Sequence, residues 1–306
     1  MDGAEDARGR TDPPDWLGEL PLAPGPPFVA MGLRGIDHAD WLVVDGEYAE
    51  QLAEKDRPGD RDVFAALPGT EAAGDEVLTL VAAWITEHGP VIARDRLAAA
   101  RPGSEDGALH PLLRAALLVQ EDLCVMSPGD DGYVLSAAAV HFPSHWRLAD
   151  KIGRPMAAIH GPVRHYADQL ATKADRFFER LAKGRIMLRR NVSIHDHDEL
   201  HRPEPPETYE DFDGDLGALW LRTERQTLRR LDGTASPAEP GPTGDVLFTI
   251  KTQQCPLAAV REDPDVAHGL AAKLRAIRAD QEASGLPVHA PAALPDWLDA
   301  ASSPGD

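Results

Sequence analysis

Four of the twelve histidines fall within residues 136–166, and one of them, His160, directly follows a run with helical spacing. The apolar residues of that run repeat with the period of one helix face: Leu148, Ile152, Met156 and Ile159. Since Gly161-Pro162 ends the pattern, the spacing predicts a helix over residues 146–159 with His160 at its C-terminus. A neutral imidazole there can bind a planar metal cofactor from one side, and it can also simply cap the helix. The spacing leaves both roles open.

A polar strand is the second candidate for chemistry. Over residues 217–231, strict alternation places Arg222, Glu224 and Gln226 on one face, with Arg225 on the other. A buried row of Arg, Glu and Gln needs mutual pairing or a polar ligand, such as a carboxylate or an amine, whereas a solvated sheet face needs neither. Both interpretations fit the sequence.

The remaining histidines give weaker signals. His141 and His145 flank the FPS turn before the key helix, so either is a candidate distal residue or alternative axial ligand, ranked below His160. The run IHDHDELH (194–201) has the residue types of a metal site without its helical spacing, and a solvated loop fits it better. Cys255 ends a predicted strand, where a buried neutral thiol is the common case.

The elements that position these residues divide into two groups. Helices are predicted over residues 39–55, capped by Asp37, and over 75–87 and 111–126, which together form an N-terminal helical layer. Strands are predicted over 133–142, 185–194, 217–231 and 245–257, with helices over 167–182 and 264–283. No helical crossover separates the last two strands, so residues 232–244 form a hairpin loop and the sheet is mostly antiparallel. The predicted fold class is α+β.

Several motifs of the chain resemble those of one known family. In chain order they read MGLRGIDHADWLVVDGEYAEQLAEK, LLVQEDLCVM, HFPSHWRLADKIGRPMAAIHGPV, LRRNVSIHDHDEL, LWLRTERQTLRRL and VLFTIKTQQCPL. They look like the haem-dependent oxidative N-demethylase family, and they run from about residue 31 to about residue 257. The resemblance implies a PAS-like antiparallel sheet with flanking helices and an N-terminal helical layer.

The resemblance also implies a chemistry. Related proteins bind haem b, with its iron, and oxidise N-methyl amines with dioxygen, using electrons from NAD(P)H through a flavin and iron–sulfur reductase partner. Carried over to this sequence, His160 is the iron ligand, and the cofactor-binding residues are Arg222, Arg225, Asn191, His141 and His145. The catalytic candidates are Glu224, Arg190 and Gln226. An arginine suits a haem propionate because its planar fork matches a carboxylate.

Two positions depart from the family pattern. Where the family usually has Asn-Trp, this chain has Asn191-Val192, and Arg164 replaces the second proline of an I-H-x-P-V-P motif. Losing a large aromatic residue reshapes any pocket beneath it, so the substrate, rather than haem binding, is affected.

Composition limits the function classes. The formal net charge of −20 argues against nucleic acid or an anionic membrane as partner, and two cysteines are too few for a disulfide framework. No apolar run approaches a membrane span and the N-terminus is polar, so a cytoplasmic protein is expected. We expect a flexible arm over residues 1–30, a single haem-binding domain over 31–285 and a tail over 286–306.

Two classes of function follow. The first is a haem-dependent monooxygenase that demethylates an amine and releases formaldehyde. The alternative is a PAS-like haem-binding sensor or carrier without turnover, although the sequence has no coiled-coil output helix. A chain that binds no haem is the third possibility.

Overall fold

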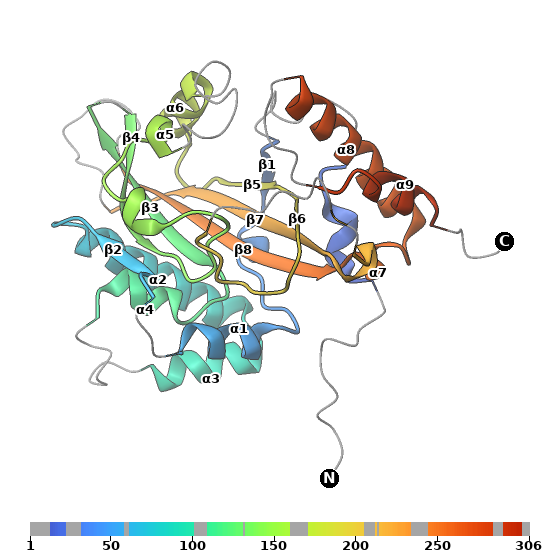
Figure 1. Cartoon of the computed structure of the whole chain (residues 1–306). Coiled ribbons are helices and arrows are strands. Elements are labelled where there is room, and N and C mark those ends of the chain that lie inside the picture. Colours follow the sequence, from blue (N-terminus) through green and yellow to red (C-terminus); the bar gives the residue numbers. More distant parts are fainter. Residues whose placement is uncertain are drawn as a thin grey trace, which may run out of the picture.

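The centre of the protein is an eight-stranded antiparallel sheet with helices on both faces (Figure 1). The computed structural model describes residues 13–22, 32–57, 61–100, 109–130, 132–159, 171–204, 212, 214–233, 244–283 and 290–301. The strands are β1 (Arg34–Ile36), β2 (Phe64–Ala66), β3 (Asp122–Gly129), β4 (Gly132–Ala139), β5 (Ile186–Arg190), β6 (Ser193–His195), β7 (Trp220–Arg230) and β8 (Val246–Pro256). They lie in the order β1-β5-β7-β8-β3-β4-β2, with β6 beside β7. The predicted α+β class is therefore confirmed.

One face of the sheet is covered by an N-terminal helical layer, as the sequence predicted. It consists of α1 (Tyr48–Lys55), α2 (Glu71–His88), α3 (Val91–Ala99) and α4 (Pro111–Ala116) (Figure 1). Trp41, Val77, Ile85, Leu123 and Val125 belong to the largest apolar cluster, which lies between these helices and the sheet. Burial of this apolar area is the main driving force that holds the two layers together.

The opposite face is covered by two short helices, α5 (Met156–Ile159) and α6 (Ala171–Arg180). A second apolar cluster lies there, in which Phe178 packs with Cys124, Leu228 and Ile250 of the sheet. At one end of the sheet, α7 (Leu257–Val260), α8 (Pro264–Glu282) and α9 (Leu294–Asp299) surround a third cluster. Leu17 of the 3₁₀ turn Asp15–Glu19 also packs in this third cluster.

The hairpin β7–β8 determines which side chains lie on each face of the sheet. Its two strands pair along their whole length, from Trp220 opposite Pro256 to Arg230 opposite Val246, as predicted for a hairpin across residues 232–244. Because side chains alternate along a strand, the even-numbered residues of β7 share the face on which Leu228 meets α6. The odd-numbered residues point to the helical layer, where Arg225 bonds to the Trp41 carbonyl.

The prediction of a helix over residues 111–126 is wrong in its second half. The helix α4 ends at Ala116, and residues 122–129 form β3 in the middle of the sheet. Its side chains are buried on both faces, with Val125 against the helical layer and Met126 against the opposite cluster. A strand buried on both faces reads as a continuous apolar run, which a helix can also produce.

The helix predicted over residues 146–159 is also wrong in extent. Residues Leu148–Asp150 form a 3₁₀ turn, and the α-helix begins only at Met156. Gly153 lies between them with φ 73°, a left-handed conformation that interrupts a helix and that glycine adopts without strain. Its N–H and the Arg154 carbonyl both bond to the backbone of Leu135, so this segment runs along β4.

Other predicted elements differ from the observed ones mainly in the residues at which they begin and end. The helices expected over 75–87 and 264–283 are α2 and α8, whereas the helix expected over 39–55 begins only at Tyr48. The predicted strand 185–194 is divided into β5 and β6 at Asn191. The short strands β1 and β2 and the helices α3 and α9 had no prediction, because short elements carry little periodicity.

Candidate functional site

The face of the sheet beneath α5 and α6, which we call the functional face, combines apolar side chains with a short row of polar ones. Partly buried apolar residues surround the buried cluster on this face, among them Trp146, Ile152, Met156, Ile159, Phe177, Met187 and Phe248. Phe248, Glu224 and Gln226 are only partly buried although β7 and β8 are central strands. A flat apolar ligand would find contacts on this face of the kind that line cofactor pockets.

Glu224 is held in position by two neighbouring amide side chains of this face. Its Oε2 accepts hydrogen bonds from Asn191 Nδ2 and Gln226 Nε2, both at 2.8 Å. The Oδ1 atom of Asn191 in turn accepts the Glu224 N–H at 2.8 Å. Among the described residues, no donor bonds to Glu224 Oε1. The carboxylate is therefore fixed in position and keeps one oxygen for a further partner.

Arg222 shares this face but is already engaged. Its guanidinium donates to the carbonyls of Phe142 at 2.7 Å and Leu200 at 3.1 Å, and more weakly to Thr252 Oγ1. The side chain is almost fully buried, and burial lowers its pKa from the usual arginine value. These bonds join the loop after β4 to the loop after β6, so little of the guanidinium is free for a ligand.

Lys151 lies over the same face, and no sequence motif pointed to it. Its Nζ lies 4.6 Å from the centre of the Trp146 ring, a cation–π contact. Burial lowers the pKa of Lys151, while the negative charge of Glu224 acts in the opposite direction. Among the described residues, no carboxylate lies within ion-pair distance of Nζ. A partly buried, unpaired ammonium suits an anionic ligand, since burial of an unpaired charge is costly.

Arg190 and Arg225 lie on the other face of the sheet, away from Glu224. Arg190 forms an ion pair with Glu19 at 2.9 Å and donates to Gln253 Oε1 at 2.8 Å. Arg225 donates to the carbonyls of Trp41 and Asp40. Both guanidinium groups connect the sheet to N-terminal segments, which is the arrangement of structural arginines.

Of the predicted histidine ligands, the structure describes His141 and His145 but not His160. His160 lies outside the described residues, but it directly follows Ile159, the last residue of α5, which packs on the functional face. His141 is buried, and desolvation lowers its pKa to about 2, so it is neutral. His145 has φ 61° and its ring stacks on that of His195 with centres 5.0 Å apart. His201 Nδ1 bonds to the His141 carbonyl at 2.9 Å.

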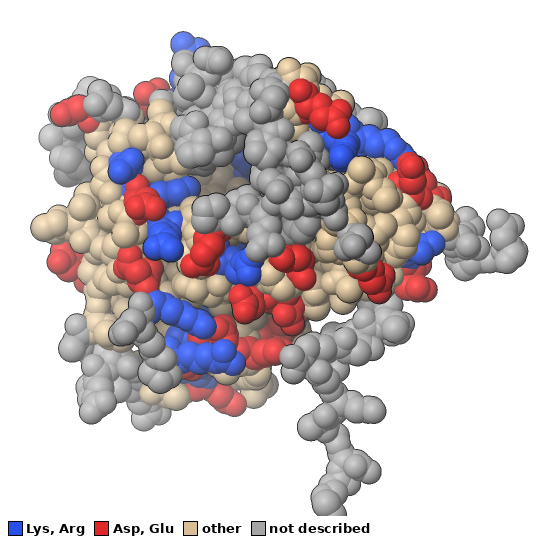
Figure 2. Space-filling view, in the orientation of Figure 1, with Lys and Arg blue, Asp and Glu red and all other residues tan. Residues whose placement is uncertain are grey.

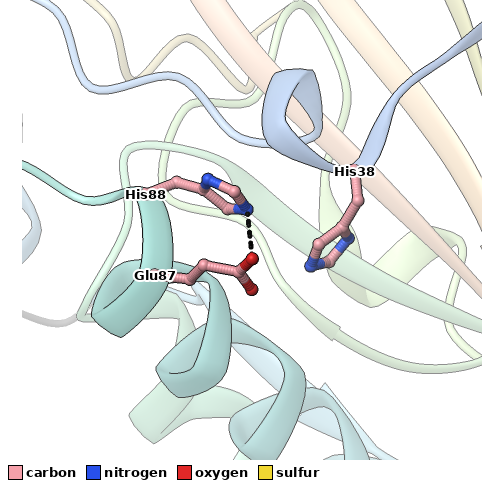
Figure 3. Close-up of side chains that lie close together, drawn as sticks. All are labelled: His38, Glu87 and His88. Atoms are coloured by element: carbon pink, nitrogen blue, oxygen red, sulfur yellow. Dashed lines mark ion pairs between the residues drawn. The ribbon is translucent and has the colours of Figure 1, made fainter.

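The run 194–201 does not gather into a metal site. His195 bonds to Ser193 Oγ, and His197 pairs with Asp196 at 3.1 Å. In the part of the chain that the structure describes, only one set of three His, Cys, Asp or Glu side chains lies close enough to hold an ion. It consists of His38, Glu87 and His88, which point toward one another beside the helical layer (Figure 3).

A cavity of about 570 Å³ opens beside α1 at one end of the central strands β7 and β8, and Glu224 does not line it. Its lining is rich in carboxylates, namely Glu47, Glu50, Glu54, Asp198 and Glu199, and also includes Arg57 and Arg61. Figure 2 shows acidic and basic side chains next to one another across the visible face, without a broad basic patch. The two arginines pair with Glu54, at 2.8 and 2.6 Å, so the remaining carboxylates give the cavity a negative character.

Comparison with known proteins identifies the family of this chain. None of the described helices is long and apolar enough to cross a membrane. No curated protein matches the chain. The model of one family, described as haem-dependent oxidative N-demethylase, alpha subunit-like, matches residues 32–283. This range contains β1 to β8, α5 and Glu224, and the chain therefore belongs to the haem-dependent oxidative N-demethylase, alpha subunit-like family.

Proposed function

We propose that this protein is a haem-dependent monooxygenase that removes an N-methyl group from an amine with dioxygen. The observation that carries the proposal is the position of Glu224, whose carboxylate is fixed by Asn191 and Gln226 on the apolar face that α5 covers. In a member of a haem-dependent oxidative family, a fixed carboxylate beside an apolar cofactor surface fits an amine substrate, because amines are cationic at neutral pH.

The order and connections of the strands support a PAS-like fold. The strands β4-β3-β8-β7-β5 are contiguous, and α5 and α6 lie between β4 and β5 in the chain. A hairpin, a helical segment and three further antiparallel strands follow one another in that order, and the helical segment returns over one face. In this fold the ligand lies between that face and the helices.

His160 is the proposed iron ligand, and Lys151 is the proposed partner of a haem propionate. The helix α5 packs on the apolar cluster through Met156 and Ile159, and His160 directly follows Ile159 in the sequence. Lys151 replaces Arg222 in the role expected from the sequence, because Arg222 donates to two carbonyl oxygens, whereas Lys151 donates to none in the part of the chain that the structure describes. When bound, haem b supplies the oxidative chemistry with dioxygen.

Glu224 is the proposed substrate-binding group. Its free Oε1 would accept a hydrogen bond from the substrate ammonium and hold the N-methyl group against the cofactor. Gln226 acts through Glu224 by fixing Oε2, and Arg190 is proposed to hold Glu19 rather than the substrate.

The overall reaction consumes the amine, one dioxygen, two electrons and two protons. It yields the demethylated amine, formaldehyde and water. The electrons would come from NAD(P)H through a flavin and iron–sulfur reductase protein, in a cytoplasmic setting. The fixed carboxylate favours this enzyme over a sensor or carrier, because a carrier has no need of a group that holds a cationic amine.

Two measurements test the proposal. The optical spectrum of the purified chain, before and after reduction and addition of carbon monoxide, should show a haem Soret band that shifts on binding CO. With an electron-supplying reductase, N-methyl amines should then give formaldehyde in proportion to the amine consumed. A protein that takes up no added haem contradicts the cofactor, and a haem protein without amine turnover points to the sensor or carrier.

A further inference from the structure

The side chains of His38, Glu87 and His88 converge at the edge of the helical layer, away from the proposed haem face (Figure 3). We propose that they form a binding site for a divalent cation of the Zn²⁺ class. Their possible ligand atoms all lie within 4.8 Å of one another, and the His88 Nε2 to Glu87 Oε1 distance is 3.5 Å. Ligand atoms of a four-coordinate zinc ion lie about 3.4 Å apart, from bonds of about 2.1 Å. The exposed Glu87 side chain can rotate to close the difference.

Both histidine rings rest on buried tryptophans. The ring of His38 stacks on Trp41 with centres 5.9 Å apart, and the ring of His88 packs at 5.9 Å from Trp84. Trp84 Nε1 also donates to the His38 carbonyl at 3.0 Å, which ties the segment that carries His38 to α2. The two imidazoles meet edge to face at 5.7 Å. A histidine pair supported in this way needs little rearrangement to bind an ion.

The electrostatic surroundings are mixed and on balance suit a cation. His88 is the last residue of α2, where the free carbonyl groups of the helix end favour positive charge, and Glu87 supplies a negative charge. The positive charge of Arg229 disfavours a bound cation. Its guanidinium lies 4.5 Å from the centre of the Trp41 ring, on which His38 stacks. The nearby carboxylates of Asp232 and Glu76 partly offset that charge.

The donor set indicates which ion would bind. Two imidazoles and one carboxylate suit Zn²⁺, Ni²⁺ or Cu²⁺ and disfavour Mg²⁺ and Ca²⁺, which prefer oxygen ligands. Three protein ligands leave one position for water.

A bound ion would act as a link between two segments far apart in the chain. His38 lies in the turn His38–Asp40. The carbonyl of Asp40, at the end of this turn, accepts a hydrogen bond from the guanidinium of Arg225 in β7. Fixing His38 to the end of α2 would therefore hold the helical layer against β7. Since a ligand that binds only the folded chain stabilises it, the ion should raise the melting temperature.

The test uses the untagged, full-length haem-loaded chain and Zn²⁺ alone, titrated by calorimetry after treatment with a chelator. We expect one Zn²⁺ per chain with a micromolar dissociation constant, and a melting temperature about 5 °C higher when the ion is at 100 times that constant. His38→Gln and His88→Gln should each weaken binding at least tenfold, and Glu87→Gln somewhat less. Mg²⁺ should give neither heat nor stabilisation.

His268→Gln is the matched control, because His268 is an exposed histidine on α8 that contacts the Asp299 carbonyl instead. It should bind Zn²⁺ like the wild type. The circular dichroism spectrum and Soret band of each variant show that it is folded. Equal Zn²⁺ affinity in the wild type and in folded His38→Gln and His88→Gln, or no binding in the wild type, overturns the site. The haem-dependent reaction is independent of either outcome.

Discussion

Asn191 and Glu224 are joined by three hydrogen bonds at the point where the strand paired with β7 changes from β5 to β6. The amide of Asn191 donates to the carboxylate and accepts the Glu224 N–H, each at 2.8 Å, and the Asn191 N–H donates to the Glu224 carbonyl at 3.2 Å. The side chain of Asn191 thus takes the place of a strand partner. It fixes the Glu224 carboxylate at the interruption between β5 and β6.

Replacing Asn191 by Ala should lower turnover without removing haem. Loss of two side-chain hydrogen bonds frees Glu224 and costs about 1 to 3 kcal/mol of stability, because the Glu224 N–H loses its acceptor. We expect at least about a tenfold fall in kcat, with a normal Soret band. Formaldehyde release and the melting temperature check this, and an unchanged kcat in the folded variant would remove the positioning role.

Replacing Glu224 by Gln keeps the shape of the side chain and an acceptor for Asn191 and Gln226, but removes the charge. If the carboxylate holds a cationic amine, amine-dependent formaldehyde release should fall at least about tenfold, which corresponds to about 1.4 kcal/mol of transition-state stabilisation. Haem content should match that of the wild type. Glu282→Gln, an exposed substitution on α8, is the control and should leave the rate unchanged. Full activity in Glu224→Gln would contradict the proposed site.

Replacing Lys151 by Met should change the haem-loaded and haem-free chains in opposite directions. Loss of the cation should speed haem transfer to an acceptor globin about tenfold, while Lys151→Arg should restore slow release. The haem-free variant should be as stable as the wild type or more stable, since an unpaired, partly buried charge is gone. Lys183→Met, which removes an exposed ion pair with Asp232, is the control. Identical haem release in Lys151→Met and the wild type would show that this lysine does not bind the cofactor.

Replacing His160 by Ala should abolish haem binding or change its spectrum qualitatively. His145→Ala should keep the Soret band, because the ring of His145 stacks on His195 and its Nδ1 meets the Glu204 carbonyl. Ferric, ferrous and CO-bound spectra of both variants distinguish them. If His160→Ala retains all three spectra of the wild type, His160 is not the axial ligand and His141 is examined next.

Two buried histidines should make the protein sensitive to acid. Burial lowers the pKa of His141 to about 2 and that of His195 to about 3, against about 6.5 in the unfolded chain. Above pH 6.5 both states are neutral and stability is complete. As the pH falls below 6.5, only the unfolded state takes up protons, so the free energy of unfolding decreases by up to about 1.4 kcal/mol per pH unit for each histidine. Urea unfolding at pH 7.5 and pH 5 should show a smaller loss for His195→Gln than for the wild type. Equal losses would mean that His195 is protonated in the folded state.

Much of the fold follows from local patterns in the sequence. Helical spacing identified α2 and α8, and the alternation and missing crossover identified the hairpin β7–β8. The same alternation placed Arg222, Glu224 and Gln226 on one face, because side-chain direction in a strand is set by the backbone alone. The family motifs supplied the proposed cofactor and reaction.

Tertiary structure decided which of these residues are free to act. Arg222 was expected to bind the cofactor, but the carbonyls of Phe142 and Leu200, distant in the chain, occupy its guanidinium. Lys151 had no predicted role, and its ammonium has no ion-pair partner among the described residues. The convergence of His38 with His88 likewise depends on the packing of a turn against a helix end 50 residues later. Spacing describes neighbours within one element, whereas burial and pairing depend on contacts between elements. The sequence by itself therefore determined the elements and their faces, and only the tertiary structure decided which charges remain unpaired.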